Sequence, residues 1–308
     1  FAFITCLIFS NSITLLAQEK NTLQLKGLKE KVEVLRDQWG VNHIYANNEH
    51  DLFFTQGYCA AKDRLFQFEI WRRQATGTVA EILGARELKR DIGTRLFKFR
   101  GDLKKELAHY HENGQAIIQA YVDGVNAYIT EANAKPALLP IEFKILKIRP
   151  AKWTAEIVIS RHQGLLGNIT QELNIGRAVS TVGDKKVKEL IWFHPKDPNL
   201  KLDTAIRGDL LKADILALYN AYRKEVEFTK SDITEQDEDD ASALDILNKR
   251  KELANFLPEQ EMEGSNNWII SGRKTASGFP MLANDPHRKI AVPSLRYIVH
   301  LVAPGWNV

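Results

Sequence analysis

The chain has few cysteines and little excess charge, and both shortages exclude classes of protein. Its 308 residues include two cysteines, and one of them, Cys6, lies in the apolar first segment. Two cysteines cannot build a disulfide framework or a thiolate cluster for zinc. The 42 Lys and Arg residues against 39 Asp and Glu residues leave a net charge of +3, with no basic stripe interleaved with aromatic residues. We therefore expect no nucleic-acid partner.

The common catalytic signatures are absent as well. The sequence contains no H-E-x-x-H, no G-x-S-x-G and no G-x-G-x-x-G, so zincin, α/β-hydrolase and dinucleotide-binding functions have no support. The run Gly272-Arg273-Lys274-Thr275 resembles the end of a phosphate-binding loop, but the glycine required upstream is missing. The eight histidines show no metal-ligand spacing.

Residues 1–17, FAFITCLIFSNSITLLA, carry no charge, and the first charged residue is Glu19. The run is too short for a stable membrane span and is typical of the hydrophobic part of a signal peptide. We expect the sequence to begin inside the signal, cleavage near Ala17–Gln18, and secretion to a periplasm. The alternative is a buried N-terminal helix or strand.

Hydrophobic patterning predicts a mixture of strands and helices. Residues 32–46 alternate as two short strands joined by a turn at Trp39-Gly40. Residues 50–84 have the spacing of amphipathic helices broken near Gly77. Further helical pattern covers residues 103–132, with expected interruptions at Gly114 and Gly124, and then residues 154–179.

A polar segment precedes a serine that begins a new strand pattern. Six of the twelve residues in SDITEQDEDDAS are acidic, and the segment from Lys224 to Glu263 reads as a solvated linker in which proteolysis is tolerated. After Gly264, residues 265–288 predict a β-hairpin. If the Gly264–Ser265 bond is cut, the new α-amine, with an ordinary pKa of about 7.7–8.0, can accept the proton of the Ser265 hydroxyl. The alternative is an ordinary Gly-Ser turn.

Two motif blocks lie on either side of the linker. The first block is VLRDQWGVNHIYA together with DRLFQ, and the second is EGSNNWIISGRKTASGFPMLANDPHR. These blocks resemble the penicillin acylase family of N-terminal-nucleophile hydrolases: the first is similar to the start of the family's α chain, and the second to the start of its catalytic β chain. The resemblance covers nearly all of the chain from about Val32, and the linker falls where the family's spacer peptide lies.

The resemblance implies an α+β fold, a four-layered αββα sandwich with a large helical α-chain part. It implies a signal peptide at residues 1–17, an α chain at 18–226, an autocatalytically excised spacer at 227–264, and the start of a β chain at 265–308. We expect this core to be truncated at the C-terminus, so that the oxyanion hole and further calcium ligands lie beyond Val308. The α and β chains would stay associated after cleavage.

The same resemblance implies hydrolysis of a linear amide through an acyl-enzyme on Ser265, with no organic cofactor. Possible substrates are β-lactam side chains, acyl-homoserine lactones or other N-acyl compounds. His287 matches a histidine that many members place close to the serine; the alternative is a capping residue. Glu172 matches a carboxylate that helps to bind a structural calcium; the alternative is a solvated helix face.

Substrate-binding positions depart from the family's pattern. Phenylacetyl-preferring members carry a Phe directly after the position of His287, where this chain has Arg288. They carry an Arg-Phe pair where it has Leu165 and Leu166. An inward Arg288 would favour an acyl group with a carboxylate, since a buried guanidinium needs a partner. The alternative is an outward Arg288 paired with an acidic surface residue.

The remaining motif residues are expected to be structural. We interpret Asp37, Asp63 and Arg64 as structural pairs. We interpret three tryptophans, Trp39, Trp71 and Trp268, as core or interface aromatics. Two rival hypotheses are a non-catalytic binding or scaffold protein with the same fold and a cytoplasmic lipid or peptide amidase that retains the N-terminal apolar run.

Overall fold

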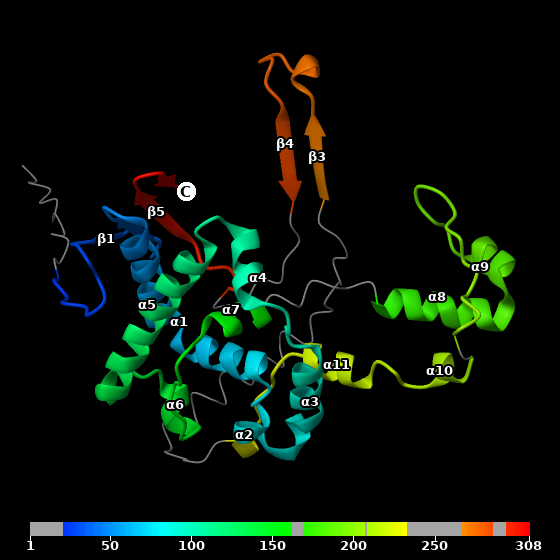
Figure 1. The fold of residues 1–308 in the computed structure, drawn as a ribbon, viewed down its shortest axis with the longest axis horizontal. Helices are drawn as coiled ribbons and strands as arrows, with labels where there is room; N and C mark the ends of the chain where they lie inside the picture. The colour runs from blue at the N-terminus through cyan, green and yellow to red at the C-terminus, as the bar shows by residue number, and fades with distance from the viewer. Residues whose placement is uncertain (1–20, 162–168, 207, 233–265, 286–293) are drawn as a thin grey trace, which may run out of the picture.

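The computed structural model describes residues 21–161, 169–206, 208–232, 266–285 and 294–308. The predicted signal peptide and most of the predicted spacer lie outside these ranges, so the boundaries proposed for the mature chains stay predictions. The described residues combine helices with two separate sheets, which confirms the α+β class (Figure 1). No helix among them is both long enough and apolar enough to cross a membrane.

Two long helices, α1 (Glu49–Thr76) and α5 (Gly114–Ala134), form the centre of the helical body (Figure 1). Helix α1 begins at Asn48, whose side chain accepts a hydrogen bond from the N–H of Asp51. It ends at Gly77, which adopts the left-handed conformation (φ 66°) that favours glycine. The predicted break at Gly77 is therefore confirmed.

The predicted interruption at Gly124 is wrong. Helix α5 passes through this residue without a break and ends at Ala134, just before Pro136. Gly124 serves close packing instead, because it lies where the backbones of α5 and α1 meet. The interface between the two helices buries a continuous apolar cluster that includes Leu65, Phe68, Val125 and Ile129.

A four-stranded sheet covers one end of this helix pair. Its order is β1 (Glu33–Arg36), β2 (Asn42–Tyr45), β5 (Val299–Ala303) and β6 (Trp306–Asn307). Strands β1 and β2 pair antiparallel around Gly40 (φ 79°), as predicted. Strand β2 also pairs in parallel with β5, so the two halves of the sheet come from opposite ends of the chain.

A second, two-stranded sheet stands apart from the first. Strands β3 (Asn266–Ile270) and β4 (Met281–Asp285) pair antiparallel and form the predicted hairpin (Figure 1, orange). The short 3-10 helix η5 (Gly272–Lys274) lies in the connection between them. Most side chains of both strands are exposed, including those of Ile269 and Leu282.

Shorter helices complete the described chain. They are α2 (Ala80–Leu83), η1 (Gly84–Glu87), α3 (Leu88–Phe97), α4 (Leu103–Tyr110), η2 (Pro136–Leu138), α6 (Ile141–Ile145), α7 (Ala155–Arg161), α8 (Ile169–Val182), α9 (Asp184–Leu190), α10 (Gly208–Lys212), α11 (Ala217–Arg223) and η4 (Lys230–Asp232). Helices α7 and α8 confirm the helical prediction for residues 154–179, apart from the undescribed residues between them.

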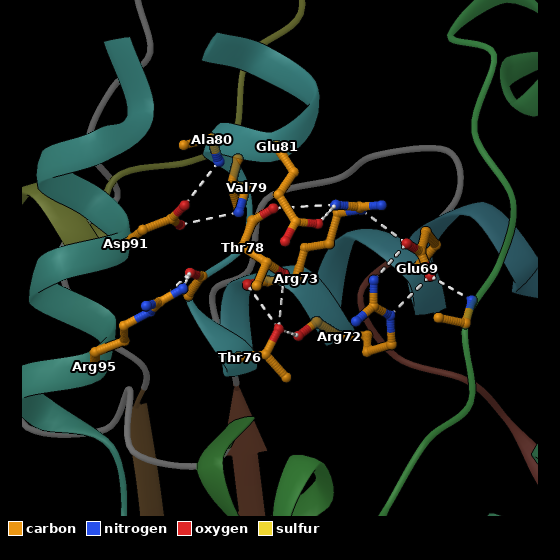
Figure 2. A network of polar contacts seen from close by, with 12 residues as sticks. Glu69, Arg72, Arg73, Thr76, Thr78, Val79, Ala80, Glu81, Asp91 and Arg95 are labelled. Atoms are coloured by element: carbon orange, nitrogen blue, oxygen red, sulfur yellow. Dashed lines mark hydrogen bonds and ion pairs between the residues drawn. The ribbon is translucent and has the colours of Figure 1, made fainter. Parts of the chain in front are cut away.

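A buried charge network fixes the chain around the end of α1 (Figure 2). The carboxylate of Glu69 has no exposed surface and accepts hydrogen bonds from Arg72 at 2.7 Å, Arg73 at 2.8 Å and the N–H of Ala151 at 3.0 Å. Beyond the Gly77 turn, Asp91 of α3 accepts from the N–H groups that open α2. These contacts hold α1, α2 and α3 in one arrangement.

Candidate functional site

The described residues include only part of the predicted site. Leu165, Leu166, Gly264, Ser265, His287 and Arg288 lie outside them, whereas Glu172 lies within them. The β3–β4 hairpin is the described element that adjoins Ser265 and His287 in the sequence.

The register of the hairpin pairs the chain positions next to the two predicted catalytic residues. Asn266, which follows Ser265 directly in the sequence, is the register partner of Asp285, which precedes His287 by two residues. Asn267 pairs with Asn284 in the same ladder. The predicted nucleophile directly precedes β3, and the predicted histidine follows the end of β4 by two residues. Both therefore adjoin the same end of one hairpin in the sequence.

Glu172 lies in the first turn of helix α8 and its side chain is exposed. Within the described ranges, no group of three or more His, Cys, Asp or Glu side chains is arranged to hold a metal ion. A calcium ion takes six to eight oxygen ligands, so Glu172 would need further donors. Its role as a calcium ligand stays a prediction.

Asp63 joins three elements through polar contacts, as expected for a structural residue. Its carboxylate accepts hydrogen bonds from Arg36 of β1 at 2.8 Å, from Asn42 of β2 at 3.2 Å and from the hydroxyl of Tyr297 at 2.9 Å. Burial and the nearby carboxylate charge raise the pKa of Tyr297, so this hydroxyl stays a donor. The hydrogen bond to Asp63 also raises the pKa of Arg36.

Arg64 extends these contacts to the segment that precedes β5. Its guanidinium donates hydrogen bonds to the carbonyl oxygens of Ser294 and Arg296, and it lies 5.7 Å from the centre of the Tyr297 ring. These contacts agree with the structural role predicted for Asp63 and Arg64. Tyr297 was not predicted, because nothing in its local sequence pattern indicates a partner more than 200 residues away.

Asp37 closes the turn between β1 and β2. Its carboxylate accepts from the N–H groups of Trp39 and Val41, each at 2.9 Å, and faces Nε2 of His43 at 3.3 Å. Desolvation opposes the charged form, but the hydrogen bonds from Val41, His43 and Trp39 outweigh it and lower the pKa of Asp37. The interpretation of Asp37 as structural is confirmed.

The three tryptophans differ from one another in burial. Trp71 packs against Phe68 at the edge of the helical core, with ring centres 5.7 Å apart. Trp39, in contrast, is 81% exposed, and Trp268 of β3 is 52% exposed. Trp39, at the tip of the β1–β2 turn, therefore does not lie in the core. The alternative of an interface aromatic stays a prediction for Trp39 and Trp268.

Comparison with known proteins assigns the chain to a family. The family model described as penicillin amidase matches residues 31–308. A relative named penicillin acylase 2 proenzyme, from Pseudomonas sp. (strain SE83), is 31% identical over 290 residues, covering 93% of this chain and 34% of the relative. An acyl-homoserine lactone acylase QuiP from Pseudomonas aeruginosa is 27% identical, covering 92% of this chain and 31% of the relative.

A solved structure described as thermostable penicillin G acylase from Alcaligenes faecalis has a TM-score of 0.46 and 27% identity, covering 57% of this chain and 98% of that one. The chain spans about a third of the length of the curated relatives reported above. The family model matches nearly all residues from the first described strand onward, and it includes both predicted motif blocks. The chain therefore belongs to the penicillin amidase family.

Proposed function

We propose that this protein is the precursor of an amidohydrolase that cleaves linear N-acyl amides through Ser265. Membership of the penicillin amidase family supports this proposal, as do relatives named for penicillin acylase and acyl-homoserine lactone acylase activities. The observation that carries it is the pairing of Asn266 with Asp285. Because of this register, Ser265 and His287 both adjoin the same end of the hairpin in the sequence.

The proposed reaction uses one residue as both nucleophile and base. Cleavage of the Gly264–Ser265 bond frees the α-amine of Ser265, which accepts the hydroxyl proton as Oγ attacks the amide carbonyl. The C–N bond breaks, the amine leaves with that proton, and the acyl group remains on Oγ as an ester. Water then attacks the ester, releases the carboxylic acid and restores the serine hydroxyl.

Two further elements belong to the proposal. Glu172 would contribute to a structural calcium site, and the protein would be secreted to the periplasm after loss of residues 1–17. The α and β chains would stay associated after cleavage. The contacts of Asp63 and Arg64 with residues 294–297 support this association, because they join segments that precede the linker to a segment that follows it.

The test of the proposed activity compares amide hydrolysis by the full-length wild-type protein and by two full-length variants. A panel of amides with one chromogenic leaving group and phenylacetyl, aliphatic or glutaryl acyl groups supplies the substrates. We expect wild type to release the chromophore from at least one of them and Ser265→Ala to show only background release. Ser265→Cys keeps a nucleophile at this position, so it tests maturation of the precursor separately from amide hydrolysis. Hydrolysis by Ser265→Ala at the wild-type rate would refute the proposed nucleophile.

A further inference from the structure

His43 and His300 face each other across the junction between β2 and β5. The two residues are register partners in the parallel ladder, so their side chains lie on the same face of the sheet. Their Nδ1 atoms are 3.0 Å apart, and the ring planes meet at 83°. This is the distance of a hydrogen bond, so the positions of the hydrogen atoms decide whether the contact is attractive.

The outer nitrogens of both rings face hydrogen-bond acceptors. Nε2 of His43 lies 3.3 Å from a carboxylate oxygen of Asp37, and Nε2 of His300 lies 3.0 Å from the side-chain oxygen of Asn307. In the tautomer in which each Nε2 donates to its acceptor, each Nε2 carries the hydrogen of its ring. Because a neutral imidazole carries only one N–H, both Nδ1 atoms then present lone pairs to each other. Two lone pairs at 3.0 Å repel unless a cation lies between them.

We propose that His43 and His300 together form a binding site for one d-block cation of the Zn²⁺ type. Zinc binds imidazole nitrogen at about 2.0–2.1 Å, and two such bonds at a tetrahedral angle place the nitrogens about 3.3 Å apart. The Nδ1 atoms are already 3.0 Å apart. An ion about 2.0–2.1 Å from both nitrogens lies to one side of the line that joins them, so both rings rotate to point their lone pairs at it.

The surroundings of the two rings match those of histidines that bind metals. Histidine ligands commonly donate their second N–H to a carboxylate or a carbonyl oxygen, which fixes the tautomer and orients the ring. Asp37 and Asn307 supply such acceptors here. Imidazole ligands favour zinc, copper and nickel, whereas calcium takes oxygen ligands. The site is thus chemically distinct from the calcium site proposed at Glu172.

The site is open to solvent. The side chain of His43 is 31% exposed, and His300 is partly buried beside the ring of Tyr45. Within the described chain, the pair is not part of a group of three or more His, Cys, Asp or Glu side chains that could hold a metal. Water would complete the coordination, so we expect binding weaker than at a structural zinc site with four protein ligands.

The position of the site suggests a consequence for the mature protein. Strand β2 precedes the linker and β5 follows it, so an ion held by both histidines would bridge the two chains that the proposed cleavage creates. This consequence rests on the proposed function, whereas ion binding itself does not. A protein that binds zinc but never cleaves itself would refute the proposed maturation and leave the metal site standing.

Calorimetric titration of chelator-stripped protein with ZnCl₂ tests the site. We use pH 7.5, where ordinary imidazoles are neutral. Wild type should bind one ion per chain, and His43→Gln and His300→Gln should each weaken binding at least tenfold. Asp37→Asn, which keeps an acceptor oxygen for the turn, should weaken it by about 10–100-fold, as other losses of a ligand's hydrogen-bond partner do. The matched control, His109→Gln on the exposed surface of α4, should leave binding unchanged.

A spectroscopic measurement keeps the proposal testable if either variant fails to fold. In wild-type protein labelled with ¹⁵N at histidine, zinc should shift the Nδ1 resonances of His43 and His300 and leave that of His109 in place. Absence of zinc binding by wild type would overturn the metal site. A single proton shared between the two Nδ1 atoms, with no response to zinc, would also overturn the metal site. The positive charge between the rings would then be that proton.

Discussion

Gly124 of α5 packs directly against the backbone of Phe54 in α1. A β-carbon built on Gly124 would lie 1.9 Å from the carbonyl oxygen of Phe54, far inside van der Waals contact. A glycine of α1 makes the corresponding contact with α5. A β-carbon built on Gly57 would lie 2.1 Å from the carbonyl oxygen of Tyr121. The two longest helices therefore depend on glycine at both positions for their close approach.

Gly124→Ala should destabilise the protein. The added methyl group has no space between two rigid backbones, and overpacking of this kind costs about 1–3 kcal/mol. Gly176→Ala is the matched control, since this helical glycine has only flexible leucine side chains nearby, at 3.7 and 3.8 Å. Its better helix propensity should stabilise the protein by up to about 1 kcal/mol. Urea unfolding measures both, and an equal effect of the two substitutions would contradict the packing argument.

The prediction of a break at Gly124 failed for a reason that the sequence does not show. A glycine in a helical pattern can end the helix or allow another helix to approach, and the choice depends on residues that are distant in sequence. At Gly77 the local signal was sufficient, because the apolar periodicity stops there and the left-handed conformation closes the helix.

Local patterns likewise predicted both hairpins, but they could not pair β2 with β5. The pairing joins His43 to His300, which are 257 residues apart in the sequence. Nothing in either strand alone specifies this partner. The predicted nucleophile depended on the family resemblance, since Gly-Ser before a strand is also the sequence of an ordinary turn.

Glu69→Gln should weaken the network at the end of α1. The substitution removes the charge that compensates Arg72 and Arg73, whose side chains are only 12% and 9% exposed. Loss of one partner of a buried ion pair costs about 3–5 kcal/mol. Glu81→Gln is the control: Glu81 also pairs with Arg73 but is 64% exposed, so its loss should cost at most about 1 kcal/mol. Similar melting temperatures for the two variants would refute this account of the network.

Removal of calcium should lower the melting temperature if Glu172 is a ligand. An ion that binds only the folded state stabilises it by mass action. Wild type should therefore melt at a lower temperature in EGTA, and Glu172→Ala should show a lower melting temperature that EGTA does not change. Glu189→Ala, at a residue whose side chain is 63% exposed on α9, is the control. Melting curves that EGTA leaves unchanged in wild type and Glu172→Ala alike would remove the assignment.

Arg288 should set the preference for the acyl group. If its guanidinium faces the acyl pocket, a glutaryl amide should be hydrolysed better than a phenylacetyl amide, because the carboxylate pairs with the charge. Arg288→Phe should reverse this order, whereas Arg273→Phe in the hairpin connection should not. The measurement is kcat/KM for the two amides. A wild-type preference for phenylacetyl that Arg288→Phe leaves unaltered would refute the specificity argument.

The mass and N-terminal sequence of the matured protein test the central claim most directly. We expect the full-length wild-type precursor to yield a chain that begins at Ser265, because only a free amine on that residue can serve as the base. Ser265→Ala should remain uncleaved at this bond. A wild-type protein that hydrolyses N-acyl amides while its Gly264–Ser265 bond stays intact, or whose new N-terminus is another residue, would contradict the account.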